Sequence, residues 1–91
     1  MSYQIEEEVL LDHDIDTLPM RDLIVYNDDV NTFDHVIDTL IKVCGHTSEQ
    51  AEQCTVIIHY KGKCGVKRGS FEELIPLRTA LCDRGLSAEI S

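Results

Sequence analysis

A short apolar strand that runs straight into a cluster of polar residues constrains this chain most. The run Leu23–Tyr26 has strand character, and the next three residues are Asn27–Asp29 (Asn-Asp-Asp). Asn and Asp favour turns because their side chains bond nearby backbone groups. A helical pattern begins soon afterwards. We therefore expect three polar side chains at a strand-to-helix corner, a common place for a binding site. A solvated turn with a helix cap is the alternative interpretation.

Hydrophobic periodicity predicts three strands and three helices. The expected strands are Met20–Tyr26, Lys63–Lys67 and Leu86–Ile90. The expected helices are Thr32–Cys44, Ser48–Tyr60 and a third from the cap at Ser70 to a stop at Gly85. This order, tail–β–α–α–β–α–β, predicts an α+β domain in which a small antiparallel three-stranded sheet packs with three helices.

Residues that can cap helices support these boundaries. Asn31 is the expected N-cap of the first helix, with Asp34 completing a capping box. The later helices carry the same pattern, starting at Thr47 and at Ser70. Pro76 lies inside the third helix and is expected to kink it or shorten its start, because proline removes a backbone donor.

The charge is concentrated at the start of the chain. Residues 1–19 hold six acidic residues and no Lys or Arg, within a formal net charge of −9 for 91 residues. We expect residues 1–19 to be a flexible acidic tail and residues 20–91 to be one small folded domain. The negative charge argues against nucleic-acid binding. No apolar run approaches the roughly 20 residues of a membrane span, and the acidic start is unlike a signal peptide, so a cytoplasmic location is expected.

The four cysteines are widely spaced and form no C-x-x-C motif. Because the chain is expected to be cytoplasmic, the cysteines are expected to be buried or partly buried thiols. A zinc site drawn from this region stays open as an alternative, although the paired spacing of zinc ligands is absent. Its candidate ligands are Cys44, His46, Cys54, His59 and Cys64. The main expectation is that the chain needs no metal or other cofactor.

A second polar motif lies at the end of the second helix, where His59 begins the sequence His-Tyr-Lys-Gly-Lys. Together with the Asn-Asp-Asp turn, this motif resembles the ClpS family, adaptors that deliver N-degron substrates to the Clp AAA+ protease. The resemblance covers about residues 20–90. It implies the ClpS fold, which is similar to the C-terminal domain of the ribosomal stalk protein L7/L12, and a binding protein that is not an enzyme.

The resemblance implies a site for the free N-terminus of a polypeptide. An α-amino group has a pKa of about 7.7–8.0, so it is mostly a cation at neutral pH and needs acceptors. The family's amine-binding roles map to Asn27, Asp28 and His59. Asp29 and Asn31 are expected near the site or as supports of the turn.

The resemblance also implies an apolar pocket for the first side chain of the substrate. The matching residues are Phe33, Val36, Thr55, Ile58 and Leu86. Phe33 and Thr55 stand where relatives commonly have Met, so a stiff ring is expected to change the mouth of the pocket. Thr55 is expected to widen or polarise its wall. The implied substrates begin with Leu, Phe, Tyr or Trp, and β-branched residues are excluded by crowding.

The implied partner is the N-domain of a ClpA- or ClpC-type ATPase, and the chain is expected to be a monomer. One alternative is a structural or protein-interaction domain of L7/L12-like fold, which would give Asn27, Asp28 and His59 no joint task. Another is a hydrolase or metal enzyme that uses Asp28, His59 and a cysteine. No G-x-S-x-G or H-E-x-x-H motif supports that enzyme.

Overall fold

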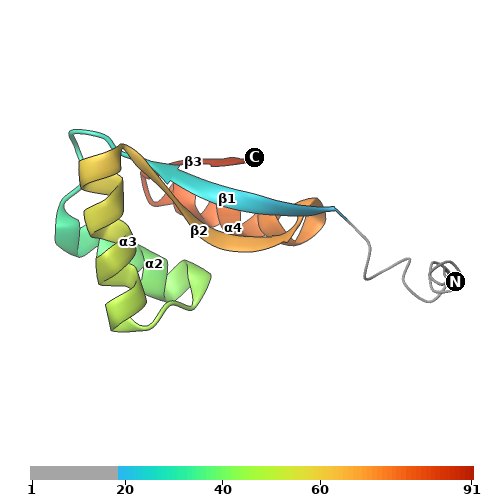
Figure 1. The fold of residues 1–91 in the computed structure, drawn as a ribbon, viewed down its shortest axis with the longest axis horizontal. Coiled ribbons are helices and arrows are strands. Elements are labelled where there is room, and N and C mark those ends of the chain that lie inside the picture. Colours follow the sequence, from blue (N-terminus) through green and yellow to red (C-terminus); the bar gives the residue numbers. More distant parts are fainter. Residues whose placement is uncertain (1–18) are drawn as a thin grey trace, which may run out of the picture.

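The computed structural model describes residues 19–91, so the expected acidic tail, apart from Pro19, lies outside the described residues. The elements are β1 (Met20–Tyr26), α2 (Phe33–Cys44), α3 (Ser48–Lys61), β2 (Lys63–Ser70), α4 (Phe71–Asp83) and β3 (Ser87–Ile90). Three strands and three helices in this order confirm the predicted α+β fold (Figure 1).

The sheet is antiparallel and has the order β2–β1–β3, so β1 is its central strand. Leu23 and Val25 on β1 are almost fully buried. Helix α4 lies along one face of the sheet, whereas α2 and α3 stand as a pair at the end where β1 finishes (Figure 1). The polar residues that follow β1 are therefore delivered to the junction between the sheet and this helix pair.

Strand β2 is longer than predicted, since it continues to Ser70 instead of ending at Lys67. Leu23 pairs with Lys67 and Ile24 pairs with Gly65, so Val66 is the extra residue of a β-bulge. The side chain of Val66 is buried, which places it in the core. The extra length arises from pairing with β1, which overrides the weak strand propensity of the last residues of β2.

The start of α2 corrects one prediction. Thr32 is the N-cap, and its Oγ1 accepts a hydrogen bond from the backbone N–H of His35 at 3.1 Å. The predicted cap at Asn31 is wrong because α2 begins at Phe33, one residue later than a cap at Asn31 requires. Asp34 consequently lies one position too early for a capping box, and His35 occupies that place.

The other helix boundaries follow the predictions closely. The capping boxes that start at Thr47 and Ser70 are both present. Helix α3 ends at Lys61, one residue later than predicted. Pro76 lies within α4 without shortening the start of that helix. Gly85 adopts φ of 91°, which suits the stop after α4.

One hydrophobic core joins the sheet to all three helices. Its buried residues are Leu23, Val25, Val36, Leu40, Cys44, Ala51, Ile58, Val66, Leu74, Leu81, Leu86 and Ala88. In the described part of the chain, no helix is long and apolar enough to cross a bilayer.

Candidate functional site

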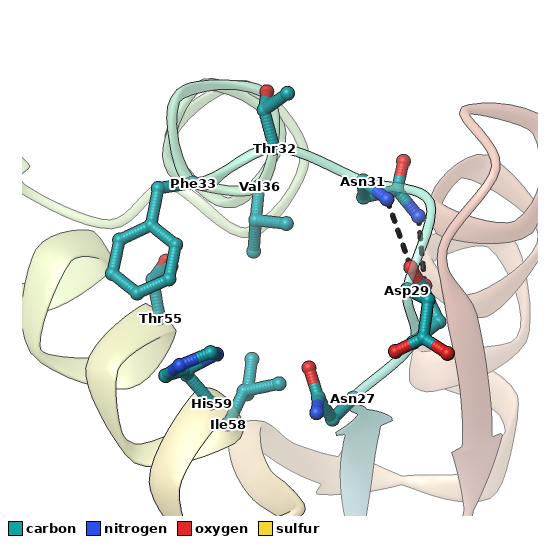
Figure 2. A pocket seen from close by; sticks show the side chains of 10 residues that line it. Asn27, Asp29, Asn31, Thr32, Phe33, Val36, Thr55, Ile58 and His59 are labelled. Atoms are coloured by element: carbon teal, nitrogen blue, oxygen red, sulfur yellow. Dashed lines mark hydrogen bonds between the residues drawn. The ribbon is translucent and has the colours of Figure 1, made fainter.

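A cavity of about 350 Å³ opens where the end of β1, the start of α2 and the end of α3 meet (Figure 2). It is lined by Asn27, Asp28, Asp29, Asn31, Thr32, Phe33, Val36, Thr55, Ile58 and His59. Nine of the ten residues predicted for the site therefore lie around one cavity.

The tenth residue, Leu86, does not line this cavity. It precedes β3 and is buried in the core, and it borders a different hollow beside Tyr26 and Cys82. Its backbone N–H bonds to the carbonyl oxygen of Leu81, which holds the chain in the tight stop of α4. Thr32 was not predicted as a lining residue, although its place beside Phe33 was a usable signal.

Asp28 holds the turn after β1 together. Its Oδ1 accepts from the backbone N–H groups of Val30 at 2.8 Å and Asn31 at 2.9 Å, and its Oδ2 accepts from Asn31 Nδ2 at 2.8 Å. The hydrogen bond from the Asn31 backbone N–H is the main cause that lowers the pKa of Asp28 below its ordinary 3.8, against an opposing effect of partial burial. Most of the acceptor capacity of this carboxylate is thus used within the turn.

Asn31 connects this turn to a distant one. Besides bonding Asp28, its Nδ2 donates to the carbonyl oxygen of Gly85 at 2.9 Å, across 54 positions of sequence. The predicted place of Asn31, beside the site and supporting the turn, agrees with this geometry. Both donors of its side-chain amide are occupied, which fixes the orientation of this amide in the turn.

Asn27 and Asp29 present to the cavity acceptors that no other residue of 19–91 uses. The backbone N–H of Asn27 bonds to the carbonyl oxygen of Gly62 at 2.9 Å, which ties the end of β1 to the turn after α3. Figure 2 shows the amide oxygen of Asn27 directed into the cavity and the carboxylate of Asp29 at the same rim. Within residues 19–91, the Asp29 carboxylate makes no hydrogen bond or ion pair.

His59 stands at the opposite side of the cavity on the last turns of α3 (Figure 2). Its ring meets Phe33 edge-on, with centroids 5.3 Å apart and an interplanar angle of 72°, and it contacts Tyr60 at 5.2 Å. Aromatic pairs favour this geometry. Within the described residues neither ring nitrogen has a hydrogen-bond partner, so the ring is positioned by packing and its nitrogens stay open to a ligand.

The inner wall of the cavity is apolar. Val36 and Ile58 are buried, and Figure 2 shows Val36 pointing into the space. Thr55 is also buried, and its hydroxyl donates to the carbonyl oxygen of Ala51 at 2.7 Å. Because this proton is used within α3, Thr55 offers the cavity no free donor. Its main effect on the wall is its small volume.

The charge of the lining is negative. Asp28 and Asp29 are the ionisable carboxylates, and no Lys or Arg lines the cavity. Acceptors, a negative rim and an apolar floor are what a cation attached to an apolar group requires.

The zinc alternative finds no support in the described part of the chain, where no three His, Cys, Asp or Glu side chains gather closely enough to hold a metal ion. Burial raises the pKa of Cys44 and of Cys64 to about 11 each. Both thiols are therefore expected to stay protonated at neutral pH.

Known proteins resemble this chain in sequence. The family model described as ATP-dependent Clp protease adaptor protein ClpS matches residues 16–89. The ClpS of a Nostoc strain is 42% identical over 57 residues, which cover 62% of this chain and 59% of that protein. The ClpS of Thermosynechococcus vestitus is 37% identical over 70 residues, covering 76% and 74%. The E3 ubiquitin-protein ligase UBR1 of Drosophila melanogaster is 34% identical over 58 residues, which are 64% of this chain and 3% of the ligase.

A solved structure resembles the fold. ClpS2 of Agrobacterium tumefaciens bound to L-phenylalaninamide superposes with a TM-score of 0.64 over 79% of this chain and 96% of that one, at 14% identity. The match to the Nostoc relative spans about three fifths of that protein's length. The family model, in contrast, extends over most of this chain. The chain therefore belongs to the ClpS family of ATP-dependent Clp protease adaptor proteins.

Proposed function

We propose that this chain is an adaptor that binds the free α-amino group and the bulky apolar first side chain of N-degron polypeptides, and delivers them to a Clp AAA+ ATPase of ClpA or ClpC type. The observation that carries the proposal is the single cavity in which an apolar floor meets a rim of unused acceptors and negative charge. Membership of the Clp protease adaptor family supports the delivery step.

The amine is held by three acceptors at the rim. The amide oxygen of Asn27 and one nitrogen of a neutral His59 ring accept from the ammonium group. Asp29 supplies the free carboxylate, since it lines the cavity without a partner in the described part of the chain. Asp28 contributes its charge and its one remaining acceptor position, and it acts mainly by fixing the turn.

The first side chain enters the apolar part between α2 and α3. Val36, Thr55 and Ile58 form the floor, and Phe33 stands at the mouth against His59. A stiff ring at the mouth crowds the Cβ of the bound residue, which favours Leu, Phe, Tyr and Trp over β-branched residues. The L-phenylalaninamide bound to the structurally similar ClpS2 has a free α-amino group and a phenylalanine side chain on the same α-carbon, which supports this assignment.

Fluorescence anisotropy with two labelled peptides tests the proposal. Both start with Phe and differ only because one is acetylated at its N-terminus. We expect the free peptide alone to bind. Loss of a charge-assisted hydrogen bond costs about 1.5–3 kcal/mol, so Asn27→Ala and His59→Ala should weaken binding about 10- to 100-fold.

The matched control is Glu72→Ala, which alters an exposed residue on α4 outside the cavity and should leave the affinity unchanged. If the free and the acetylated peptide bind equally well, or if neither binds, the proposed function is refuted.

Delivery has its own assay. Purified ClpA or ClpC with its peptidase should degrade a fluorescent protein that begins with Phe faster when the adaptor is present. The acidic segment 1–18 is proposed to engage the ATPase, so its removal should reduce degradation and spare peptide affinity. The adaptor is proposed to act as a cytoplasmic monomer.

A further inference from the structure

A second hollow lies beside the mouth of the proposed site, on the other side of Phe33. It lies between α2 and α3, has a volume of about 650 Å³, and is lined by Phe33, Asp34, Ile37, Glu49, Glu52, Gln53 and Val56. We call it the α2–α3 groove. Phe33 borders both the α2–α3 groove and the candidate cavity, so the two spaces adjoin at this ring.

The groove has a direction and a length set by α3. Glu49, Glu52, Val56 and His59 follow one another at steps of three and four residues, so they share one face of the helix. Glu49 lies ten residues before His59, which is about 15 Å along a helix. An extended peptide advances about 3.3 Å per residue. A polypeptide whose first residue sits beside His59 thus reaches Glu49 with about its fifth or sixth residue.

The rim of the groove carries unpaired negative charge. Asp34, Glu49 and Glu52 form no ion pair within residues 19–91, and no Lys or Arg lines the groove. The helix dipole accounts for Asp34 and Glu49, which lie in first turns. It does not account for Glu52, which lies beyond the first turn of α3.

The floor of the groove exposes apolar surface. Phe33 is 43% exposed and Val56 is 40% exposed. Apolar side chains flanked by unpaired carboxylates complement a segment that carries both apolar and basic residues. The acidic segment 1–18 of this chain, with no Lys or Arg, is repelled by such a rim, and so is a second copy of a chain with net charge −9.

We propose that the α2–α3 groove binds residues three to six of the same polypeptide whose N-terminus occupies the cavity, and that it favours segments in which Lys or Arg alternate with apolar residues. This inference rests on the proposed function, because the occupied cavity sets the start and direction of the bound chain. It adds a second determinant of substrate choice, remote from the amine and the first side chain.

Three labelled peptides with free N-terminal Phe test the groove. They carry Lys, Ser or Glu at positions four and six, which project to the same side of an extended chain, with Leu at positions three and five. An exposed ion pair contributes about 0.2–1 kcal/mol. We therefore expect the Lys peptide to bind about three- to tenfold more tightly than the Glu peptide at low salt. Screening at about 0.5 M salt should reduce this difference.

Two double variants assign the effect to the groove. Glu49→Gln with Glu52→Gln removes two rim charges and should reduce the preference for the Lys peptide to less than twofold. Glu72→Gln with Glu89→Gln makes the same change in net charge at exposed positions outside the groove and should keep the preference. Circular dichroism confirms that both variants are folded.

Equal affinities of the three free peptides for the unmodified protein would refute the proposed role of the α2–α3 groove. A preference for the Lys peptide that persists in the variant with Glu49→Gln and Glu52→Gln would refute it too. Acetylated versions of the same peptides separate this failure from that of the proposed function. If free peptides bind and acetylated ones do not, the N-terminal site stands whatever the charge series shows. If acetylation changes nothing, the proposed function itself has failed.

Discussion

The adjacent residues Asp28 and Asp29 should differ sharply in their effect on stability. The Asp28 carboxylate accepts three hydrogen bonds within the turn after β1. The Asp29 carboxylate accepts none in the described part of the chain, and its side chain is exposed. Replacing each residue by Ala removes the same group from neighbouring positions. The pair therefore compares a carboxylate that holds the turn with one that does not.

The size of the difference follows from the bonds. A hydrogen bond to a charged group contributes about 1.5–3 kcal/mol when it is well shielded, but here the bond to Val30 is exposed and those to Asn31 are only part-buried. Loss of a comparable side-chain cap at a helix start costs about 0.5–2 kcal/mol. We expect Asp28→Ala to lower the free energy of unfolding by about 1.5 kcal/mol, or the melting temperature by roughly 6–12 °C. Asp29→Ala should stay within about 0.5 kcal/mol of the unmodified protein.

Acid should remove this difference. The pKa of Asp28 is lower in the folded protein than the ordinary 3.8, so its contribution is complete above that value and is lost as the pH falls through the lower folded pKa. Urea unfolding of both variants at neutral pH and at successively lower pH below about 4 measures the effect. Equal costs for the two substitutions at neutral pH, or a cost of Asp28→Ala that does not shrink in acid, would refute the turn-holding role.

Three further outcomes are expected. His59→Gln keeps a hydrogen-bond acceptor, so it should retain more affinity for the free Phe peptide than His59→Ala does in the anisotropy assay; equal losses in the two variants would contradict the acceptor role. Thr47→Ala should lower the free energy of unfolding by about 1 kcal/mol, because α3 loses its cap. Thermal unfolding measures this loss, and an unchanged melting temperature would show that the cap does not stabilise the fold. Burial raises the pKa of the Cys44 and Cys64 thiols to about 11, so iodoacetamide should modify the exposed Cys82 before these two. Peptide mass spectrometry measures the three rates, and equal rates would contradict the expected order.

Elements whose local signals agree could be predicted from sequence alone. Helix α3 is an example, because its apolar pattern, the capping box at Thr47 and the glycine at position 62 all mark the same segment. The site residues in the turn after β1 and at the end of α3 could also be proposed from sequence, because the resemblance to ClpS rested on the motifs of these two segments. The cavity contains nine of the ten predicted residues.

The predictions that were wrong depended on contacts between distant parts of the chain. Asn31 and Thr32 are both good N-caps. In the structure the Thr32 hydroxyl caps α2, whereas the Asn31 side chain donates to Gly85, 54 positions away. Strand β2 extends to Ser70 because β1 pairs with it. The pocket role of Leu86 stays a prediction, since this residue is buried in the core and lies outside the lining of the cavity. Local propensity contains none of these constraints.

The same long-range contacts explain why the candidate site is open to a ligand. The turn after β1 is fastened at one end by the bond from Asn27 N–H to Gly62 and at the other by the bond from Asn31 to Gly85. Asp28 closes the turn between them. Because these bonds fix the backbone, the amide oxygen of Asn27 and the carboxylate of Asp29 are positioned without being used. A ligand that binds there need not order the turn, and avoiding that entropic cost favours affinity. Substitutions at Asn31 should therefore weaken peptide binding because they loosen the turn that positions Asn27 and Asp29. Asn31 itself supplies no acceptor to the amine in this proposal.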